Sequence, residues 1–149
     1  KIFGEGPSGE SLRAMAKKNI EFLGKVTDNQ RAELYRESLA FLHPQVEDFG
    51  ITPIESMASG RPVLAYGQGG ALETVLPGKT GMFFFEQTWE CLANAVIHFQ
   101  PEQYDQHFIR SYALQFSKQA FQEKFKKYVG EKWAQFTAQN HKITKSQNQ

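Results

Sequence analysis

The stretch of sequence that decides the fold is LAFLHPQVEDFGITPIESMASGRPVLAY, residues 39–66. Apolar runs open and close it, and they predict strands at 39–43 and 62–66. The residues between them predict a short helix over 53–59, with a proline in its first turn. Two apolar strands joined by a helix are typical of a parallel sheet whose two faces are both covered.

The same alternation of strands and helices continues on both sides of this stretch. Upstream and downstream we expect strands at 1–3, 20–23 and 82–85, and helices ending near residue 18 and covering 29–38, 71–76, 89–99, 102–115 and 118–139. Thr88 is expected to be the N-cap of the helix at 89–99. The fold class is therefore α/β, a Rossmann-like parallel sheet with helices on both faces, followed by C-terminal helices. We assign residues 1–100 to the Rossmann-like domain, 101–139 to the C-terminal helices and 140–149 to a flexible tail. The abrupt first strand also leads us to expect a domain truncated at its N-terminus.

The composition excludes several classes of protein. The chain has 149 residues, 40% of them hydrophobic and 22% charged, which fits one globular domain and neither a disordered nor a collagen-like chain. Its net charge of +1 argues against nucleic acid as a partner, because nucleic-acid-binding domains carry a strong basic excess. The sequence has no apolar run long enough to span a bilayer and no leader pattern, so we expect neither a transmembrane helix nor a retained signal peptide.

Acidic residues follow the strand at 39–43, at the edge where open parallel sheets bind ligands. Glu47 lies in the loop after this strand, where a carboxylate can accept hydrogen bonds from a polyol. Thr52 and Glu55 have the spacing of a capping box, which is a purely structural explanation for Glu55. The backbone N–H groups at the start of the helix favour phosphate. Carboxylates beside such a helix end suit a sugar nucleotide, and a turn without any ligand remains the alternative.

Two glycine-rich turns follow other strands. Gly4, Gly6 and Gly9 spell the G-x-G-x-x-G pattern of dinucleotide-binding domains, although Pro7 within it is unusual for that role. This pattern keeps a nicotinamide-dependent oxidoreductase as an alternative. The turn GQGG at 67–70 follows the strand at 62–66 and is expected beside the same crevice as Glu47.

The sequence does not support a metal site. Its four histidines and three aspartates show neither ligand spacing nor an Asp-x-Asp pair, so we expect no metal. The single cysteine, Cys91, cannot form a disulfide within the chain, which suits a reducing compartment. It lies in an apolar helical face and is expected to be a core residue. We therefore expect a cytoplasmic protein.

Six blocks of sequence, in this order, resemble the C-terminal domain of retaining GT-B glycosyltransferases of glycosyltransferase family 4. The blocks are Gly4-x-Gly6-Pro7, Phe22-Leu23-Gly24-x-Val26, Leu42-His43-Pro44, Glu47-x7-Glu55-Ser56-Met57-Ala58-x-Gly60-x-Pro62-Val63, Gly69-Gly70-x-x-Glu73-x-Val75 and Gly78-x-Thr80-Gly81. The resemblance covers roughly residues 1–100. The stretch AYGQGGALET over 65–74 is similar to the mannosyltransferase branch, which implies GDP-mannose as donor.

The resemblance implies a role for each site residue. Glu47 is expected to be catalytic and to bind hydroxyls of the donor sugar, and Glu55 to bind the ribose. The other residues expected to bind the donor are Phe49, Gly50, Ile51, Thr52, Gly24, Lys25, Val26 and Gly4. The family typically works without an Asp-x-Asp metal site. The acceptor implied for the whole enzyme is lipid-linked or a polysaccharide.

Two departures from the family pattern stand out. The family's Arg and Lys that neutralise the leaving diphosphate precede the strand that corresponds to residues 1–3, so we expect this piece to lack them together with the family's N-terminal acceptor domain. Because losing such charge stabilisation costs orders of magnitude in rate, we expect this piece alone to be inactive. Gln45 stands where the family usually has a serine. A non-catalytic interaction module with the same fold is the remaining alternative.

The last expected helix is both aromatic and basic. Residues 101–149 hold 8 Lys+Arg against 4 Asp+Glu, whereas residues 1–100 hold 9 against 12. The apolar residues that recur at helical spacing are Phe121, Phe125, Tyr128, Val129, Trp133 and Phe136. This face is expected to pack on another protein surface, with peripheral binding at the inner face of a membrane as the alternative. An uncovered face would favour self-association.

Overall fold

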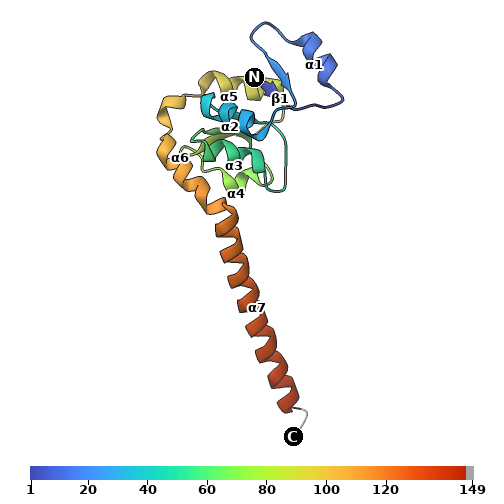
Figure 1. Cartoon of the computed structure of the whole chain (residues 1–149), viewed down its shortest axis with the longest axis vertical. Helices are drawn as coiled ribbons and strands as arrows, with labels where there is room; N and C mark the ends of the chain where they lie inside the picture. Colours follow the sequence, from blue (N-terminus) through green and yellow to red (C-terminus); the bar gives the residue numbers. More distant parts are fainter. Residues whose placement is uncertain (147–149) are drawn as a thin grey trace.

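The structure is a computed structural model that describes the backbone of residues 1–146 and the side chains of residues 1–139 (Figure 1). Parallel strands alternate with helices, which confirms the α/β fold class. The strands are β1 (Ile2–Phe3), β2 (Phe22–Gly24), β3 (Phe41–His43), β4 (Val63–Tyr66) and β5 (Gly81–Phe84). The helices are α1 (Gly9–Met15), α2 (Asp28–Glu37), α3 (Ile51–Ala58), α4 (Ala71–Thr74), α5 (Trp89–His98), α6 (Gln106–Ala113) and α7 (Lys118–Ser146), with 3₁₀ turns η1 (Pro101–Gln103) and η2 (Leu114–Phe116).

The strands form two parallel sheets where one was expected. β1 pairs with β2, and β3, β4 and β5 form the second sheet in that order. In a doubly wound sheet the strands lie side by side in the order 3-2-1-4-5-6, where the numbers give their order in the sequence. The second and fourth strands of such a sheet are therefore separated by one strand. Within residues 1–146, no strand occupies that place between β1 and β3. The two sheets therefore do not join.

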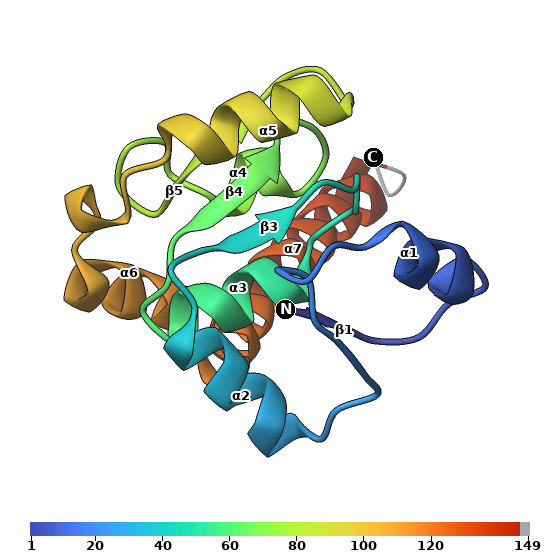
Figure 2. The same cartoon turned by 90° about the horizontal axis from the view of Figure 1, so that it is seen from above.

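Both faces of β4, the central strand of the three-stranded sheet, are covered, as its apolar character predicts, whereas Leu42 of the neighbouring β3 is 45% exposed. Val63 and Ala65 of β4 pack with α3, α4 and α6, whereas Leu64 and Tyr66 point to the other face and pack with α5. Figure 2 shows α5 on one side of β4 and α3 on the other. Every residue of β4 is buried, so this strand is the centre of the fold.

Residues 99–117 differ from the single helix expected over 102–115. They form η1, α6 and η2, because the Asp105 side chain accepts hydrogen bonds from the backbone N–H groups of His107 and Phe108 and starts a new helix. Ile109 and Ala113 of α6 are buried in the core beneath α3. The preceding helix α5 begins as expected, with Thr88 as its N-cap.

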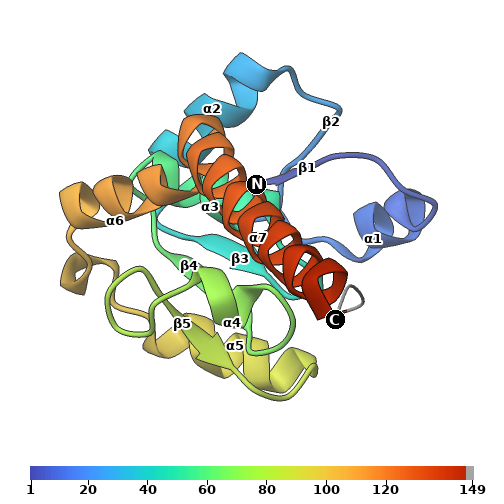
Figure 3. The same cartoon turned by 90° about the horizontal axis from the view of Figure 1, so that it is seen from below.

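Helix α7 leaves the body of the molecule and extends away from it (Figure 1). Figure 3 looks at the body from below, with α7 in front of it. It runs to Ser146, past the expected end at Gln139, because neither glycine nor proline interrupts the sequence there. The side chains of residues 140–149 and the backbone of residues 147–149 lie outside the described part, so the flexible tail stays a prediction. The division of the chain at residues 100 and 139 likewise stays a prediction.

Candidate functional site

The first glutamate of the predicted site, Glu47, lies in the loop that joins β3 to α3. Its side chain is half-buried, and its Oε1 accepts a hydrogen bond of 2.9 Å from Nε2 of Gln45. Gln45 is the residue that departs from the serine of the family pattern. At this position the glutamine donates a hydrogen bond to the carboxylate of Glu47.

The glycine turn at residues 67–70 lies directly against this loop, as expected from the sequence. The backbone N–H of Gly70 donates to the carbonyl oxygen of Glu47 at 2.7 Å. A Cβ on Gly70 would lie 2.5 Å from the carbonyl oxygen of Asp48 and 2.5 Å from Cα of Phe49. Only glycine permits this approach, so the turn fixes the position of the Glu47 loop.

Helix α3 begins two residues earlier than the sequence predicts. Gly50, with φ of 83°, is its N-cap in the left-handed conformation that glycine adopts readily. No side chain caps the helix, so the expected capping box of Thr52 and Glu55 is wrong. The Thr52 hydroxyl is instead buried without a hydrogen-bond partner. The unsatisfied N–H groups at this helix end make a favourable position for an anion.

Phe49 and Ile51 flank this turn at the surface. The Phe49 side chain is 47% exposed and packs edge-on against Phe116 of η2, with ring centroids 6.1 Å apart. Ile51 is 65% exposed. Both predicted residues therefore lie exposed at the start of α3.

His43 is a residue that the sequence reasoning missed as part of this site. It ends β3, is only 1% exposed, and its Nδ1 has no hydrogen-bond partner. Burial lowers the pKa of the imidazole, and the charge of Glu47 opposes this shift. Its Nε2 lies 3.7 Å from the position of a Cβ on Gly50. A neutral histidine thus packs under the turn that begins α3. Its position at the end of an apolar strand was the sequence signal that could have placed it in this site.

The second glutamate, Glu55, is held by helix α2. Nε of Arg31 lies 3.1 Å from its Oε2, and Nη2 of Arg31 lies 3.2 Å from its Oε1. The hydroxyl of Tyr35 donates to Oε2 at 3.4 Å. These contacts replace the expected capping role. Neither Arg31 nor Tyr35 could be recognised from a local sequence pattern, since they lie 24 and 20 residues from Glu55 along the chain.

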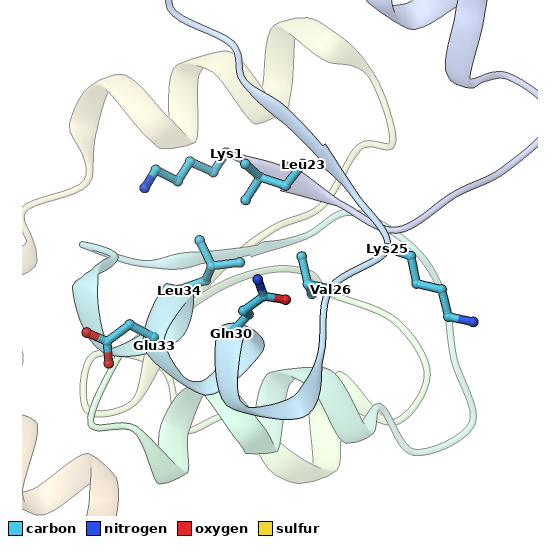
Figure 4. A pocket seen from close by; sticks show the side chains of 7 residues that line it. All are labelled: Lys1, Leu23, Lys25, Val26, Gln30, Glu33 and Leu34. Atoms are coloured by element: carbon cyan, nitrogen blue, oxygen red, sulfur yellow. The ribbon is translucent and has the colours of Figure 1, made fainter.

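A pocket of about 320 Å³ lies between α2 and the loop that follows β2 (Figure 4). Its lining residues are Lys1, Leu23, Lys25, Val26, Gln30, Glu33 and Leu34. Two of the predicted donor-binding residues, Lys25 and Val26, are among them. Gly24 directly precedes them, and its carbonyl oxygen accepts from the N–H of Gly4 at 2.7 Å. The structure therefore brings the predicted residues of the N-terminal part together.

The described residues also bear on metal binding and on the presence of a membrane-spanning helix. Among the residues that the structure describes, no group of three or more His, Cys, Asp or Glu side chains is arranged to hold a metal ion. No helix in the described part combines the length and the apolar character that a membrane span requires.

Comparisons with known proteins agree with this architecture. Alpha-1,3/1,6-mannosyltransferase ALG2 of Dictyostelium discoideum is 40% identical over 77 residues, which cover 51% of this chain and 18% of that protein. The GDP-mannose-dependent alpha-mannosyltransferase of Mycolicibacterium smegmatis is 34% identical over 103 residues, which cover 68% of this chain and 27% of that protein. The chain thus spans less than a third of the length of either relative.

A solved structure and a family model extend the comparison. Sucrose-phosphate synthase from Thermosynechococcus elongatus matches with a TM-score of 0.72 at 26% identity, over 85% of this chain and 33% of that one. The fold is that of GT-B glycosyltransferases. The family model described as glycosyl transferases group 1 matches residues 1–116. Because that match covers most of the sequence, the chain belongs to the group 1 family of glycosyl transferases.

Proposed function

We propose that this chain is the donor-binding part of a retaining glycosyltransferase that transfers a hexose, mannose from GDP-mannose, to a lipid-linked or polysaccharide acceptor. The observation that carries the proposal is that Glu47 lies in the loop before α3 and Glu55 within α3, while no side chain satisfies the N–H groups at the start of this helix. The names of the two mannosyltransferase relatives support mannose as the sugar. Membership in the family sets aside the nicotinamide-dependent oxidoreductase suggested by the first glycine turn.

In this proposal each part of the site recognises one part of the donor. The Glu47 carboxylate accepts hydrogen bonds from sugar hydroxyls, and the Glu55 carboxylate accepts them from the ribose. The start of α3, at Gly50 and Ile51, receives the diphosphate, because unsatisfied N–H groups and the helix dipole favour negative charge. The loop of Lys25 and Val26 lines the base.

We propose that donor binding needs no divalent cation. A cation commonly neutralises a sugar nucleotide when carboxylates are grouped to hold it, and the described residues contain no such group. The positive end of α3 contributes part of the compensating charge. Adding Mg²⁺ should therefore leave the affinity for GDP-mannose unchanged.

Other parts of the whole protein supply what this chain lacks. We propose a second domain that binds the acceptor and carries the cations that stabilise the leaving diphosphate, so that this chain alone binds the donor without transferring it. The aromatic face of α7 then packs on protein surface, and in an isolated chain it drives self-association. We propose that the enzyme acts in the cytoplasm, with peripheral binding at the inner face of the membrane as the alternative.

Calorimetric titration with GDP-mannose, GDP, UDP-glucose and NAD, each with and without Mg²⁺, tests the proposal. Saturable binding of GDP-mannose is expected, and Glu47→Ala should weaken it by about 10-fold or more, because a hydrogen bond to a charged group contributes about 1.5–3 kcal/mol. Glu102→Ala is the matched control, since Glu102 is an exposed carboxylate of η1, which follows α5 and not the strand ends that carry these loops.

The same titration separates the proposal from a non-catalytic interaction module. A module that retains the fold without the sugar site predicts that Glu47→Ala changes no binding. Tight binding of UDP-glucose without binding of GDP-mannose would identify UDP-glucose as the donor. The proposal that the protein is a glycosyltransferase would be unaffected. Absence of binding by all four nucleotides would contradict the donor-binding role.

A further inference from the structure

The clearest unassigned feature of the molecule is the clamp that α2 places on Glu55. Arg31 contacts both oxygens of the carboxylate at 3.1 and 3.2 Å, which is the two-point geometry that guanidinium and carboxylate groups favour. The two side chains are only 30% and 33% exposed. Such a contact fixes the plane of the carboxylate as well as its position.

Tyr35 makes this clamp rigid. It follows Arg31 by four residues on α2, so both side chains lie on the helix face that meets α3. The tyrosine is 3% exposed, and its ring packs edge-on against Phe3 and Phe41 with centroid separations of 5.9 and 5.4 Å. Its hydroxyl donates to Oε2 of Glu55 at 3.4 Å. The donor group is therefore held by the core.

The clamp leaves part of Glu55 available. An ionised carboxylate offers about four lone-pair sites. Arg31 uses two of them and Tyr35 a third, which leaves room for a hydroxyl donor from a ligand. Because a third of the side chain remains exposed, such a hydroxyl can reach it from solvent.

We propose that Arg31, supported by Tyr35, is the positioning residue that orients Glu55 toward the ribose, so that this pair determines the preference of the site for ribonucleotides over dideoxyribonucleotides. The inference rests on the proposed donor-binding function and assigns a role to residues outside the two glutamates. Arg31 acts through Glu55 and needs no contact with the nucleotide. Its removal should therefore reduce discrimination at the ribose hydroxyls specifically.

The test compares two ligands that differ only in those hydroxyls. The full-length protein is titrated with GDP and with 2′,3′-dideoxy-GDP, and with the corresponding uridine pair if UDP is the nucleotide bound. The wild type should prefer GDP by about 10-fold or more, because the dideoxy compound has no ribose hydroxyls that could hydrogen-bond to the charged carboxylate of Glu55. In Arg31→Ala the preference should fall below about 3-fold.

A matched control and a conservative variant make the test specific. Arg36→Ala removes an exposed arginine of the same helix that pairs with Glu33, and it should leave the preference unchanged. Tyr35→Phe keeps the ring packing and removes only the hydroxyl, so it should fold even if Arg31→Ala does not. It should lower the preference to a value between those of the wild type and Arg31→Ala.

The possible results separate this inference from the function on which it rests. If Arg31→Ala weakens both nucleotides equally and keeps the preference, Arg31 supports only the fold and the inference is overturned. If the wild type binds GDP-mannose in a Glu47-dependent manner but shows no ribose preference, the donor-binding function stands and the inference fails. If the wild type binds neither GDP nor UDP, both are overturned.

Discussion

Strand β4 and helix α7 are both rich in apolar side chains, yet only those of β4 are buried. All four residues of β4 lie in the core between α3 and α5. The apolar face of α7 is exposed along its length, and its exposed residues are Phe121, Phe125, Tyr128, Val129, Trp133 and Phe136. Periodicity in a sequence therefore predicts which face of an element is apolar, and the surrounding chain decides whether that face is covered.

This difference determines where the site can be built. The loops of Glu47 and of residues 67–70 follow β3 and β4, so the buried sheet holds them in fixed positions. A binding site needs such support, because its polar groups must keep their geometry before the ligand arrives. An exposed helix offers surface for association, but no surrounding structure holds its side chains in fixed positions.

The largest expected contrast comes from shortening one apolar residue in each region. Met57 of α3 is fully buried, so Met57→Ala should lower the free energy of unfolding by about 2–5 kcal/mol through the cavity it creates. Phe125 of α7 is 55% exposed, and Phe125→Ala should change the unfolding free energy by less than about 1 kcal/mol. Urea denaturation of both variants measures the two values. Equal losses would show that α7 is packed in solution.

Much of the fold could be predicted from the sequence because apolar runs and turn residues mark the strands locally. The parallel arrangement, the helices on both faces of β4 and the cap at Thr88 all follow from such patterns. The separation into two sheets could not be predicted, since it depends on which strands meet in space. The start of α3 was not predicted correctly because the left-handed conformation of Gly50 determines it, and no side chain caps the helix there.

The candidate site shows the same limit. The positions of Glu47 and of the glycine turn could be predicted because the ends of parallel strands meet at one edge of a sheet. The clamp on Glu55 could not, because Arg31 reaches it across the packing of α2 on α3. The local pattern of Thr52 and Glu55 instead suggested a capping box. A tertiary ion pair overrides that pattern in the structure.

A second contrast concerns one glycine in each region. A Cβ at Gly70 would meet the backbone of residues 48 and 49 at about 2.5 Å, so Gly70→Ala should destabilise the protein by about 1–3 kcal/mol and displace the Glu47 loop. Gly130 in α7 has open space around it, and Gly130→Ala should stabilise this helix by about 1 kcal/mol. Thermal unfolding and titration with GDP-mannose give both readouts. Unimpaired donor binding in Gly70→Ala would contradict the role assigned to this turn.

The smallest expected effect on stability comes from the aromatic face of α7, where the consequence should appear in association instead. Replacing Trp133 and Phe136 together by serine removes exposed side chains whose rings pack on each other, with centroids 5.9 Å apart. The free energy of unfolding of the isolated chain should change by less than about 1 kcal/mol. Its self-association, measured by sedimentation velocity over a range of concentrations, should fall markedly, because contiguous apolar surface drives association.

The matched variant Lys126→Ser and Lys127→Ser keeps the aromatic residues and removes two exposed charges of the same helix. Self-association through the aromatic face predicts that this control associates at least as strongly as the wild type, since fewer like charges repel. Weaker association in the control would instead make the lysines the contact. If both double variants associate as the wild type does, α7 is not the interface. In that case the aromatic face of α7 would remain in contact with water without a partner, whereas the apolar residues of β4 are buried.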